Sequence, residues 1–141
     1  MASSLDAGSM IGSVPFFSGL SARDRKKLLA QGKEMSYKTG DTIVAEGTTG
    51  VGFFLILDGK AEVRKKGKVL ATLSKGQFFG EMSLIDDLPR SADVVALQPV
   101  KCWAITSWSF AALIKVQPQL ALGMLKEVVK RLRTAQSSPT S

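Results

Sequence analysis

The stretch that decides the fold spans residues 78–94 and reads FFGEMSLIDDLPRSADV. We expect Gly80 to end a strand and Glu81 to begin a single helical turn, whose unpaired backbone N–H groups would favour an anion. Pro89 fixes the backbone just before Arg90, and two small residues follow. A guanidinium matches two phosphate oxygens, and a carboxylate accepts hydrogen bonds from a pair of hydroxyls. The stretch therefore indicates a site for a ligand with one phosphate and sugar hydroxyls.

A salt bridge at a turn would explain the same charges without a ligand. Arg90 follows both Glu81 and Asp86 within one short segment, so either carboxylate could pair with the guanidinium. Salt bridges are common, and short motifs match by chance. The spacing alone leaves the salt bridge and the ligand site both open.

Outward from this stretch, the sequence is typical of a β domain. From Tyr37 to about Ile105, glycines separate short runs rich in β-branched and aromatic residues. The run FFLIL, residues 53–57, is continuously apolar, which predicts a strand buried on both faces. The letters KKGK, residues 65–68, predict a hairpin tip. Many short strands at this spacing favour a sandwich or barrel.

Helical patterns flank the β region. Ser21 with Asp24 predicts the start of a short N-terminal helix that ends near Gly32. After Thr106 the pattern predicts two C-terminal helices, the first capped by Ser107 and the second beginning near Pro118. The second helix carries an apolar stripe, which we expect to pack on the β core or, as an alternative, to form a dimer seam: Ala121, Leu125, Val128 and Leu132.

The composition narrows the function classes. The 141 residues predict one domain, with a loose segment over residues 1–12 and a disordered tail over residues 137–141. The net charge of +7 favours anionic partners, although a solvated lysine-rich surface would give the same value. The absence of histidine excludes Ser-His-Asp and Cys-His catalysis, and with one cysteine it excludes the usual zinc sites. No apolar run predicts a membrane span, and the lone Cys102 fits a cytoplasmic location.

The residues around Arg90 resemble the phosphate-binding cassette of the cyclic nucleotide-binding domain family. That family includes bacterial cAMP receptor proteins, regulatory subunits of cAMP-dependent kinase and cyclic-nucleotide-gated channels. The resemblance rests on a Phe-Gly-Glu step at residues 79–81, an apolar-small-apolar step at 82–84, and Pro-Arg-small-Ala at 89–92. Weaker similarity extends from Val14 to Arg133. It implies a cyclic nucleotide-binding domain over residues 13–136 that is mainly β, with a double-stranded β-helix (jelly-roll) core, a short N-terminal helix and two C-terminal helices.

The resemblance also implies roles for individual residues. Arg90 would pair with the cyclic phosphate, and Glu81 would hold the ribose 2′-hydroxyl. The predicted ligand-binding set is Gly80, Glu81, Met82, Ser83, Leu84, Pro89, Arg90, Ser91 and Ala92. The residues expected to cover the base are Leu132, Arg133 and Gln136. Asp93 departs from the Thr or Ser common in the family, and we expect its side chain to face away from the phosphate.

The resulting prediction is a regulatory module that senses a cyclic nucleotide, either cAMP or cGMP, with cAMP preferred. We expect that it is not an enzyme and that it needs no metal or further cofactor. Its C-terminal helix would pass the signal to an effector protein in another chain, and a homodimer is left open. One alternative is an interaction module with a degenerate nucleotide site, whose basic residues near Lys60 to Lys68 and Lys126 to Arg133 contact an acidic partner. Another is a non-catalytic cupin-like protein. Nucleic acid is not expected as a partner because no recognition helix is visible.

Overall fold

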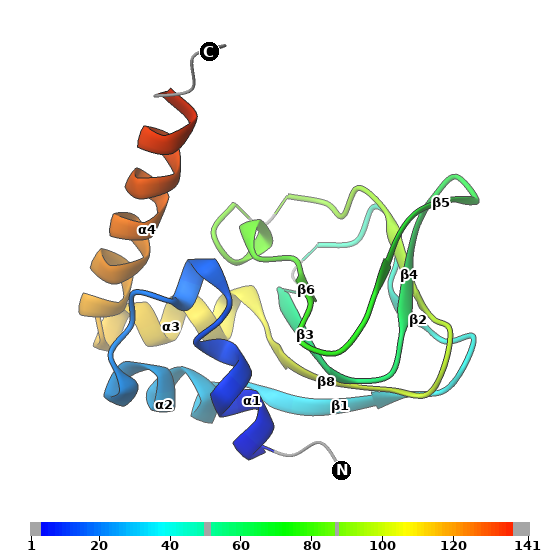
Figure 1. The fold of residues 1–141 in the computed structure, drawn as a ribbon, viewed down its shortest axis with the longest axis horizontal. Helices are drawn as coiled ribbons and strands as arrows, with labels where there is room; N and C mark the ends of the chain where they lie inside the picture. Colours follow the sequence, from blue (N-terminus) through cyan, green and yellow to red (C-terminus); the bar gives the residue numbers. More distant parts are fainter. Residues whose placement is uncertain (1–3, 50–51, 87, 137–141) are drawn as a thin grey trace.

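The computed structural model describes residues 4–49, 52–86 and 88–136, and it shows a β barrel with helices gathered at one end (Figure 1). The barrel consists of two four-stranded antiparallel sheets. One sheet has the order β1 (Lys33–Tyr37), β8 (Val100–Ile105), β3 (Phe53–Asp58), β6 (Phe78–Phe79). The other has the order β2 (Thr42–Val44), β7 (Asp93–Ala96), β4 (Ala61–Lys65), β5 (Lys68–Leu73). The predicted jelly-roll architecture with flanking helices is confirmed.

Strand β3 lies between two separate cores. Phe53, Leu55 and Leu57 face the core shared with the helices, while Phe54 and Ile56 face the barrel interior. Successive side chains of a strand point to opposite faces, so a strand covered on both sides needs an unbroken apolar run. The run at residues 53–57 is therefore buried on both faces, as predicted.

The barrel interior holds the single cysteine. Cys102 lies on β8 and is fully buried in the cluster that also contains Ile56 and Val100. Burial raises the pKa of its thiol to about 12. The thiolate is the reactive form of cysteine, so almost none of this side chain is reactive at neutral pH.

We expect native Cys102 to resist alkylation by iodoacetamide at pH 8 and to react fully after unfolding in guanidinium chloride. The reason is the raised pKa together with complete burial. Mass spectrometry of the alkylated protein measures the effect. Rapid modification of the native protein would contradict the placement of Cys102 inside the barrel.

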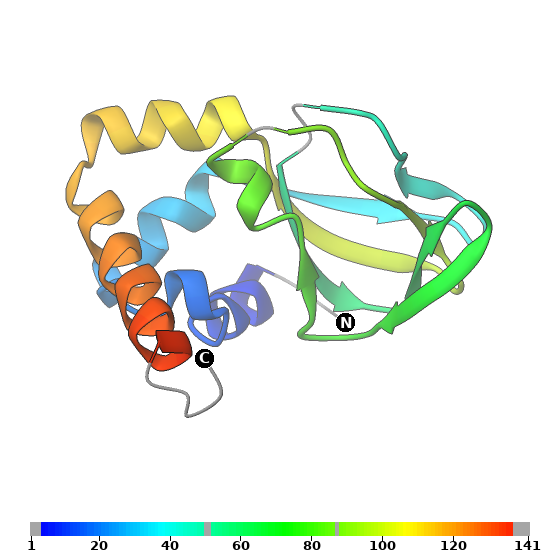
Figure 2. The same ribbon diagram turned by 90° about the horizontal axis from the view of Figure 1, so that it is seen from above.

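The N-terminal helices pack against the outer face of the first sheet (Figure 2). Helix α2 (Ala22–Gln31) begins as predicted, since the Ser21 hydroxyl accepts a hydrogen bond from the Asp24 N–H at 3.1 Å. A short 3₁₀ helix, η1 (Pro15–Phe17), precedes it and buries Phe16 and Phe17. These contacts fix the helices on the barrel.

The prediction of a loose segment over residues 1–12 is wrong for residues 4–11, which form helix α1 (Ser4–Ile11). Ala7 and Ile11 lie one helical turn apart and are fully buried in the same core as Leu28. Tertiary packing therefore orders a segment whose composition favours a loop. The predicted disordered tail over residues 137–141 lies outside the described residues.

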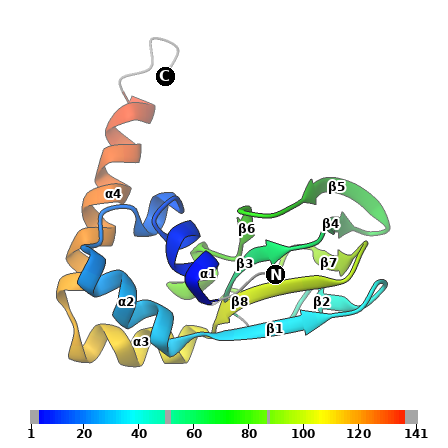
Figure 3. The ribbon, with the colours of Figure 1, turned by 60° about the horizontal axis from the view of Figure 1, so that its bottom comes forward.

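The two C-terminal helices are present, but their details differ from expectation. Helix α3 (Ser107–Val116) is capped by Thr106, whose hydroxyl accepts a hydrogen bond from the Ser109 N–H at 3.2 Å, rather than by Ser107. Helix α4 (Gln119–Gln136) packs on η1 and α3 and extends away from the barrel (Figure 3). The region described includes no helix with the length and apolar character needed to cross a membrane.

The apolar stripe on α4 does not pack on the β core, so that prediction is wrong. Helix α4 instead buries Leu120 and Met124, which lie one turn apart on a neighbouring face. Leu125, Val128 and Leu132 are exposed. The spacing of apolar residues correctly identified a stripe along the helix. Which face of α4 is buried, however, depends on the direction in which the helix leaves the rest of the domain.

Candidate functional site

The segments that contain Gly52, Gly80 and Arg90 meet at the end of β6. Gly80 has a φ of 85°, in the left-handed region that glycine adopts without strain. A Cβ atom at this position would collide with the carbonyl oxygen of Gly52 and with the guanidinium of Arg90. The close approach therefore requires glycine, and it places the Arg90 head group next to the residue that precedes Glu81.

The guanidinium of Arg90 has no carboxylate partner among the described residues. Its Nη2 atom donates a hydrogen bond to the carbonyl oxygen of Gly52, which is neutral. None of the ion pairs in the described ranges includes Arg90, so the alternative salt bridge to Glu81 or Asp86 is not formed. Burial lowers the pKa of Arg90, because desolvation penalises its charged form. A half-buried cation with several donors that the described residues leave unused is suited to an anionic ligand.

Backbone hydrogen bonds hold Arg90 in place. Its N–H donates to the Thr48 carbonyl, and its carbonyl accepts from the Gly47 N–H, both at 2.8 Å. Asp93 strengthens the same attachment, since its Oδ1 accepts from the Glu46 N–H at 2.6 Å. The loop after β2 therefore positions the arginine.

Asp93 points away from the barrel interior, and its orientation relative to a bound phosphate stays a prediction. It alternates on β7 with Val94, which is buried in the interior cluster. Its role as an anchor for the loop after β2 was missed by sequence reasoning. The partner is a backbone N–H that is 47 residues away, and no local pattern encodes such a pair.

Glu81 begins the short 3₁₀ helix η2 (Met82–Leu84). The N–H groups of Ser83, Leu84 and Ile85 bond to carbonyls of the same turn, so these three do not supply the unpaired donors that the sequence suggested. Leu84 is buried in the core shared with the helices, which fixes η2 to the body of the domain. Met82, by contrast, is 73% exposed.

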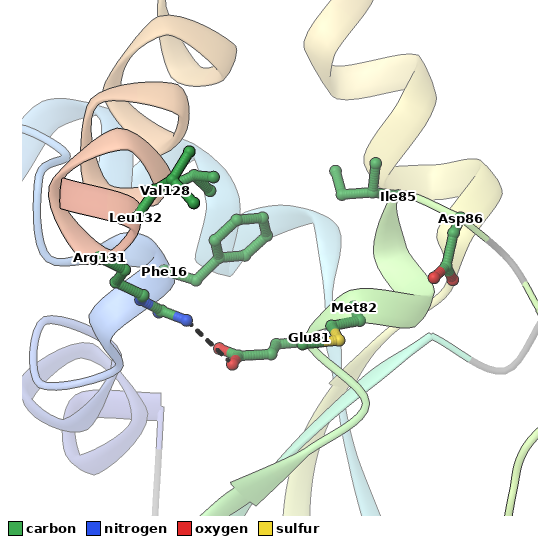
Figure 4. A pocket seen from close by; sticks show the side chains of 8 residues that line it. All are labelled: Phe16, Glu81, Met82, Ile85, Asp86, Val128, Arg131 and Leu132. Atoms are coloured by element: carbon green, nitrogen blue, oxygen red, sulfur yellow. Dashed lines mark hydrogen bonds and ion pairs between the residues drawn. The ribbon is translucent and has the colours of Figure 1, made fainter. Parts of the chain in front are cut away.

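The carboxylate of Glu81 pairs with α4. Its Oε1 lies 3.4 Å from Nη1 of Arg131, and Nε of Arg131 lies 3.9 Å from Oε1 of Glu127 on the same helix. Figure 4 shows the Glu81–Arg131 pair closing one end of a cleft between η2 and α4. Sequence reasoning missed Arg131, because nothing local connects two residues that are 50 positions apart.

The cleft has a volume of about 490 Å³. Its lining brings Phe16 together with residues of η2, of the segment after it and of α4: Glu81, Met82, Ile85, Asp86, Val128, Arg131 and Leu132. Of the predicted lid residues, Leu132 lines this cleft, whereas Arg133 and Gln136 are exposed on α4. Their closure over a base stays a prediction.

The remaining predicted residues surround Arg90. Pro89 and Ser91 are exposed and Ala92 is half-buried, directly before β7 begins. The structure thus gathers Gly80, Glu81 and the segment around Arg90 at one end of the barrel. Among the described residues there is no cluster of acidic or cysteine side chains that could hold a metal ion.

Comparison with known families gives one matching description, "Cyclic nucleotide-binding domain", over residues 34–117. Among curated proteins, a cAMP-dependent protein kinase regulatory subunit from Debaryomyces hansenii is 42% identical over 102 residues. The match covers 72% of this chain and 23% of that protein. A protein of the same name from Schizosaccharomyces pombe is 35% identical over 127 residues, covering 84% of this chain and 31% of the relative. The chain therefore spans less than a third of the length of either relative.

Solved structures show the same fold. The N-terminal domain of a transcriptional regulator from Streptomyces coelicolor A3(2) superposes with a TM-score of 0.82 at 29% identity, covering 90% of this chain and 92% of that one. The catabolite activator protein of Thermus thermophilus gives a TM-score of 0.67 at 32% identity, covering 86% and 60%. The resemblance inferred from the cassette residues is confirmed.

Proposed function

Because the chain belongs to the cyclic nucleotide-binding domain family, we propose that it is a non-catalytic regulatory module that senses a cyclic nucleotide, cAMP in preference to cGMP. The observation that carries the proposal is the half-buried guanidinium of Arg90, which lacks a carboxylate partner in the described ranges and lies against Gly80. The regulatory role is supported by the names of the similar kinase subunits. We propose no metal or cofactor besides the nucleotide, and a cytoplasmic location, which is supported by the lone Cys102.

The nucleotide would satisfy both charged residues. Arg90 would donate to the cyclic phosphate, with the N–H groups of Ser91 and Ala92 close behind it in the chain. Oε2 of Glu81 is buried and has no hydrogen-bond partner in the described structure. A ribose 2′-hydroxyl would supply the missing donor, and leaving such an atom unsatisfied costs about 1–3 kcal/mol.

The signal would pass through α4. Glu81 offers one oxygen to the ligand and the other to Arg131, so a ligand that moves Glu81 also changes the tether on α4. A ligand shifts a conformational equilibrium only as far as it prefers one state, and this shared carboxylate supplies such a preference. The effector in another chain would then read the position of α4.

Calorimetric titration with cAMP and with cGMP tests the proposal. We expect saturable binding of both, tighter for cAMP, together with shifts of the α4 amide signals in NMR spectra of the same samples. Binding without any change in α4 would refute the signalling route. Absence of binding by either nucleotide would favour the interaction module with a degenerate site.

The exposed face of α4 is suited to packing against a helix of a partner chain. Leu122, Leu125, Val129 and Leu132 are all exposed and follow the 3-4-3 spacing of a coiled-coil seam. Lys126 and Arg133 flank the seam on one side. In an antiparallel pair of helices, these cations would face the same cations of the second copy and repel them, whereas in a parallel pair they would face the opposite flank of the seam. We propose a parallel homodimer through this face.

Sedimentation equilibrium measures this association. We expect Leu125→Glu to convert the dimer to a monomer, because a charge in the seam would be buried without a partner. Val116→Glu is the matched control, since Val116 is also an exposed aliphatic residue, at 70% exposure, but lies on α3. A chain that is monomeric at all concentrations would overturn the homodimer and leave the seam to a different effector.

A further inference from the structure

We propose that the cleft between η2 and α4 binds a small, largely apolar molecule that carries one uncharged hydroxyl group. The cleft shares Glu81, Met82 and Leu132 with the predicted nucleotide and lid residues, but Arg90, Ser91 and Ala92 do not line it. The apolar ligand and the nucleotide would therefore compete for Oε2 of Glu81. The proposal can be tested without nucleotide, so it stands or falls separately from the proposed function.

The size and lining of the cleft fit a small molecule. Phe16, Val128 and Leu132 lie on one side of the cleft, and Met82 and Ile85 lie on the other (Figure 4). Small-molecule sites are typically 300–1,000 Å³, mostly apolar, with a few polar groups that fix orientation. The cleft, at about 490 Å³, has this composition.

A second cavity extends the apolar surface. It has a volume of about 370 Å³ and shares Phe16, Ile85 and Val128 with the cleft. Its other lining residues come from α3 and α4, and all are apolar: Phe110, Ile114, Ala121, Met124 and Leu125. An apolar body that enters the cleft can therefore continue between the two C-terminal helices.

The polar end of the cleft determines the head group. Nη2 of Arg131 is a buried donor without an acceptor, and Oε2 of Glu81 is a buried acceptor without a donor, within the described residues. A hydroxyl group can accept from the first and donate to the second. The carboxylates of Glu81 and Asp86 both line the cleft against the single cation of Arg131, which disfavours an anionic head group.

The test uses 1-octanol, its methyl ether and octanoate, followed by NMR of side-chain methyl groups in the nucleotide-free protein. We expect 1-octanol to give saturable shifts at Met82, Met124 and Val128. The ether cannot donate to Glu81, so it should bind about tenfold more weakly. Octanoate should bind more weakly than the alcohol. Equal affinity for alcohol and ether, tighter binding of octanoate, or no saturable shift at these methyl groups would overturn the proposal.

Two matched pairs of variants locate the site. Val128→Phe places a larger side chain in both cavities and should abolish binding of 1-octanol, whereas Val116→Phe, at an exposed position of α3 outside both linings, should not. Arg131→Met should weaken binding of the alcohol about tenfold, and Arg23→Met, at an exposed position of α2 outside both linings, should leave it unchanged. The same response from both members of either pair would place the ligand elsewhere and refute the assignment.

Discussion

Replacing Arg90 with alanine is expected to weaken cAMP binding by about 2–5 kcal/mol, which corresponds to roughly 30-fold to several-thousand-fold in affinity. The guanidinium is half-buried, and its hydrogen bond within the described structure goes to the neutral carbonyl of Gly52. Its removal would leave a phosphate in the site without its counter-charge. Titration calorimetry on the wild type and on Arg90→Ala measures the loss.

The Arg90→Ala protein should still fold. Within the part of the chain that the structure describes, the side chain loses only its hydrogen bond to Gly52, and one such bond contributes about 0.5–1.5 kcal/mol. Arg64→Ala is the matched control, because Arg64 is also half-buried but pairs with Glu62 at 2.6 Å on β4, away from the cassette. The Arg64→Ala variant should bind cAMP like the wild type. Unchanged affinity in a folded Arg90→Ala protein would remove the central observation behind the proposed function.

Replacing Gly80 with alanine is expected to destabilise the domain by about 2–5 kcal/mol. Part of the loss is backbone strain, since the left-handed conformation of Gly80 costs a residue with a side chain about 1–2 kcal/mol of stability. The rest comes from collision of the new Cβ with the Gly52 carbonyl and the Arg90 guanidinium, because overpacking typically costs about 1–3 kcal/mol. Urea denaturation monitored by tryptophan fluorescence measures the change.

Gly76→Ala separates the two contributions. Gly76 has a φ of 87°, close to the value at Gly80, but a Cβ there would meet nothing within 4 Å. We expect only the strain term in this variant, so it should be clearly more stable than Gly80→Ala. If both variants lose the same stability, the close contact among Gly80, Gly52 and Arg90 is not tight in solution.

Local signals predicted most of the fold. The continuous apolar run of β3 requires a strand covered on both faces, and Ser21 can satisfy the Asp24 N–H without help from distant residues. The hairpin tip follows from Lys66 and Gly67, which both adopt positive φ as a two-residue turn demands. In each case the residues that cause the feature lie within a few positions of it, so the local sequence is enough to predict it.

Distant contacts account for what the sequence did not predict. Helix α1 is ordered because Ala7 and Ile11 reach a core built by other elements. The buried face of α4 depends on where η1 lies, and the partner of Glu81 depends on where α4 ends. Within the candidate site, residue types indicated an anion-binding arginine, but only the structure shows that Arg90 has no carboxylate partner among the described residues.

The pairing of Glu81 with Arg131 has a consequence for genetics. Loss of Glu81 would remove a ribose contact and the tether of α4 together, whereas loss of Arg131 would remove the tether alone. A selection for variants whose output no longer responds to the messenger should therefore recover substitutions at position 131 that still bind it. Mutational phenotypes at positions 81 and 131 would then separate detection from transmission within one small domain.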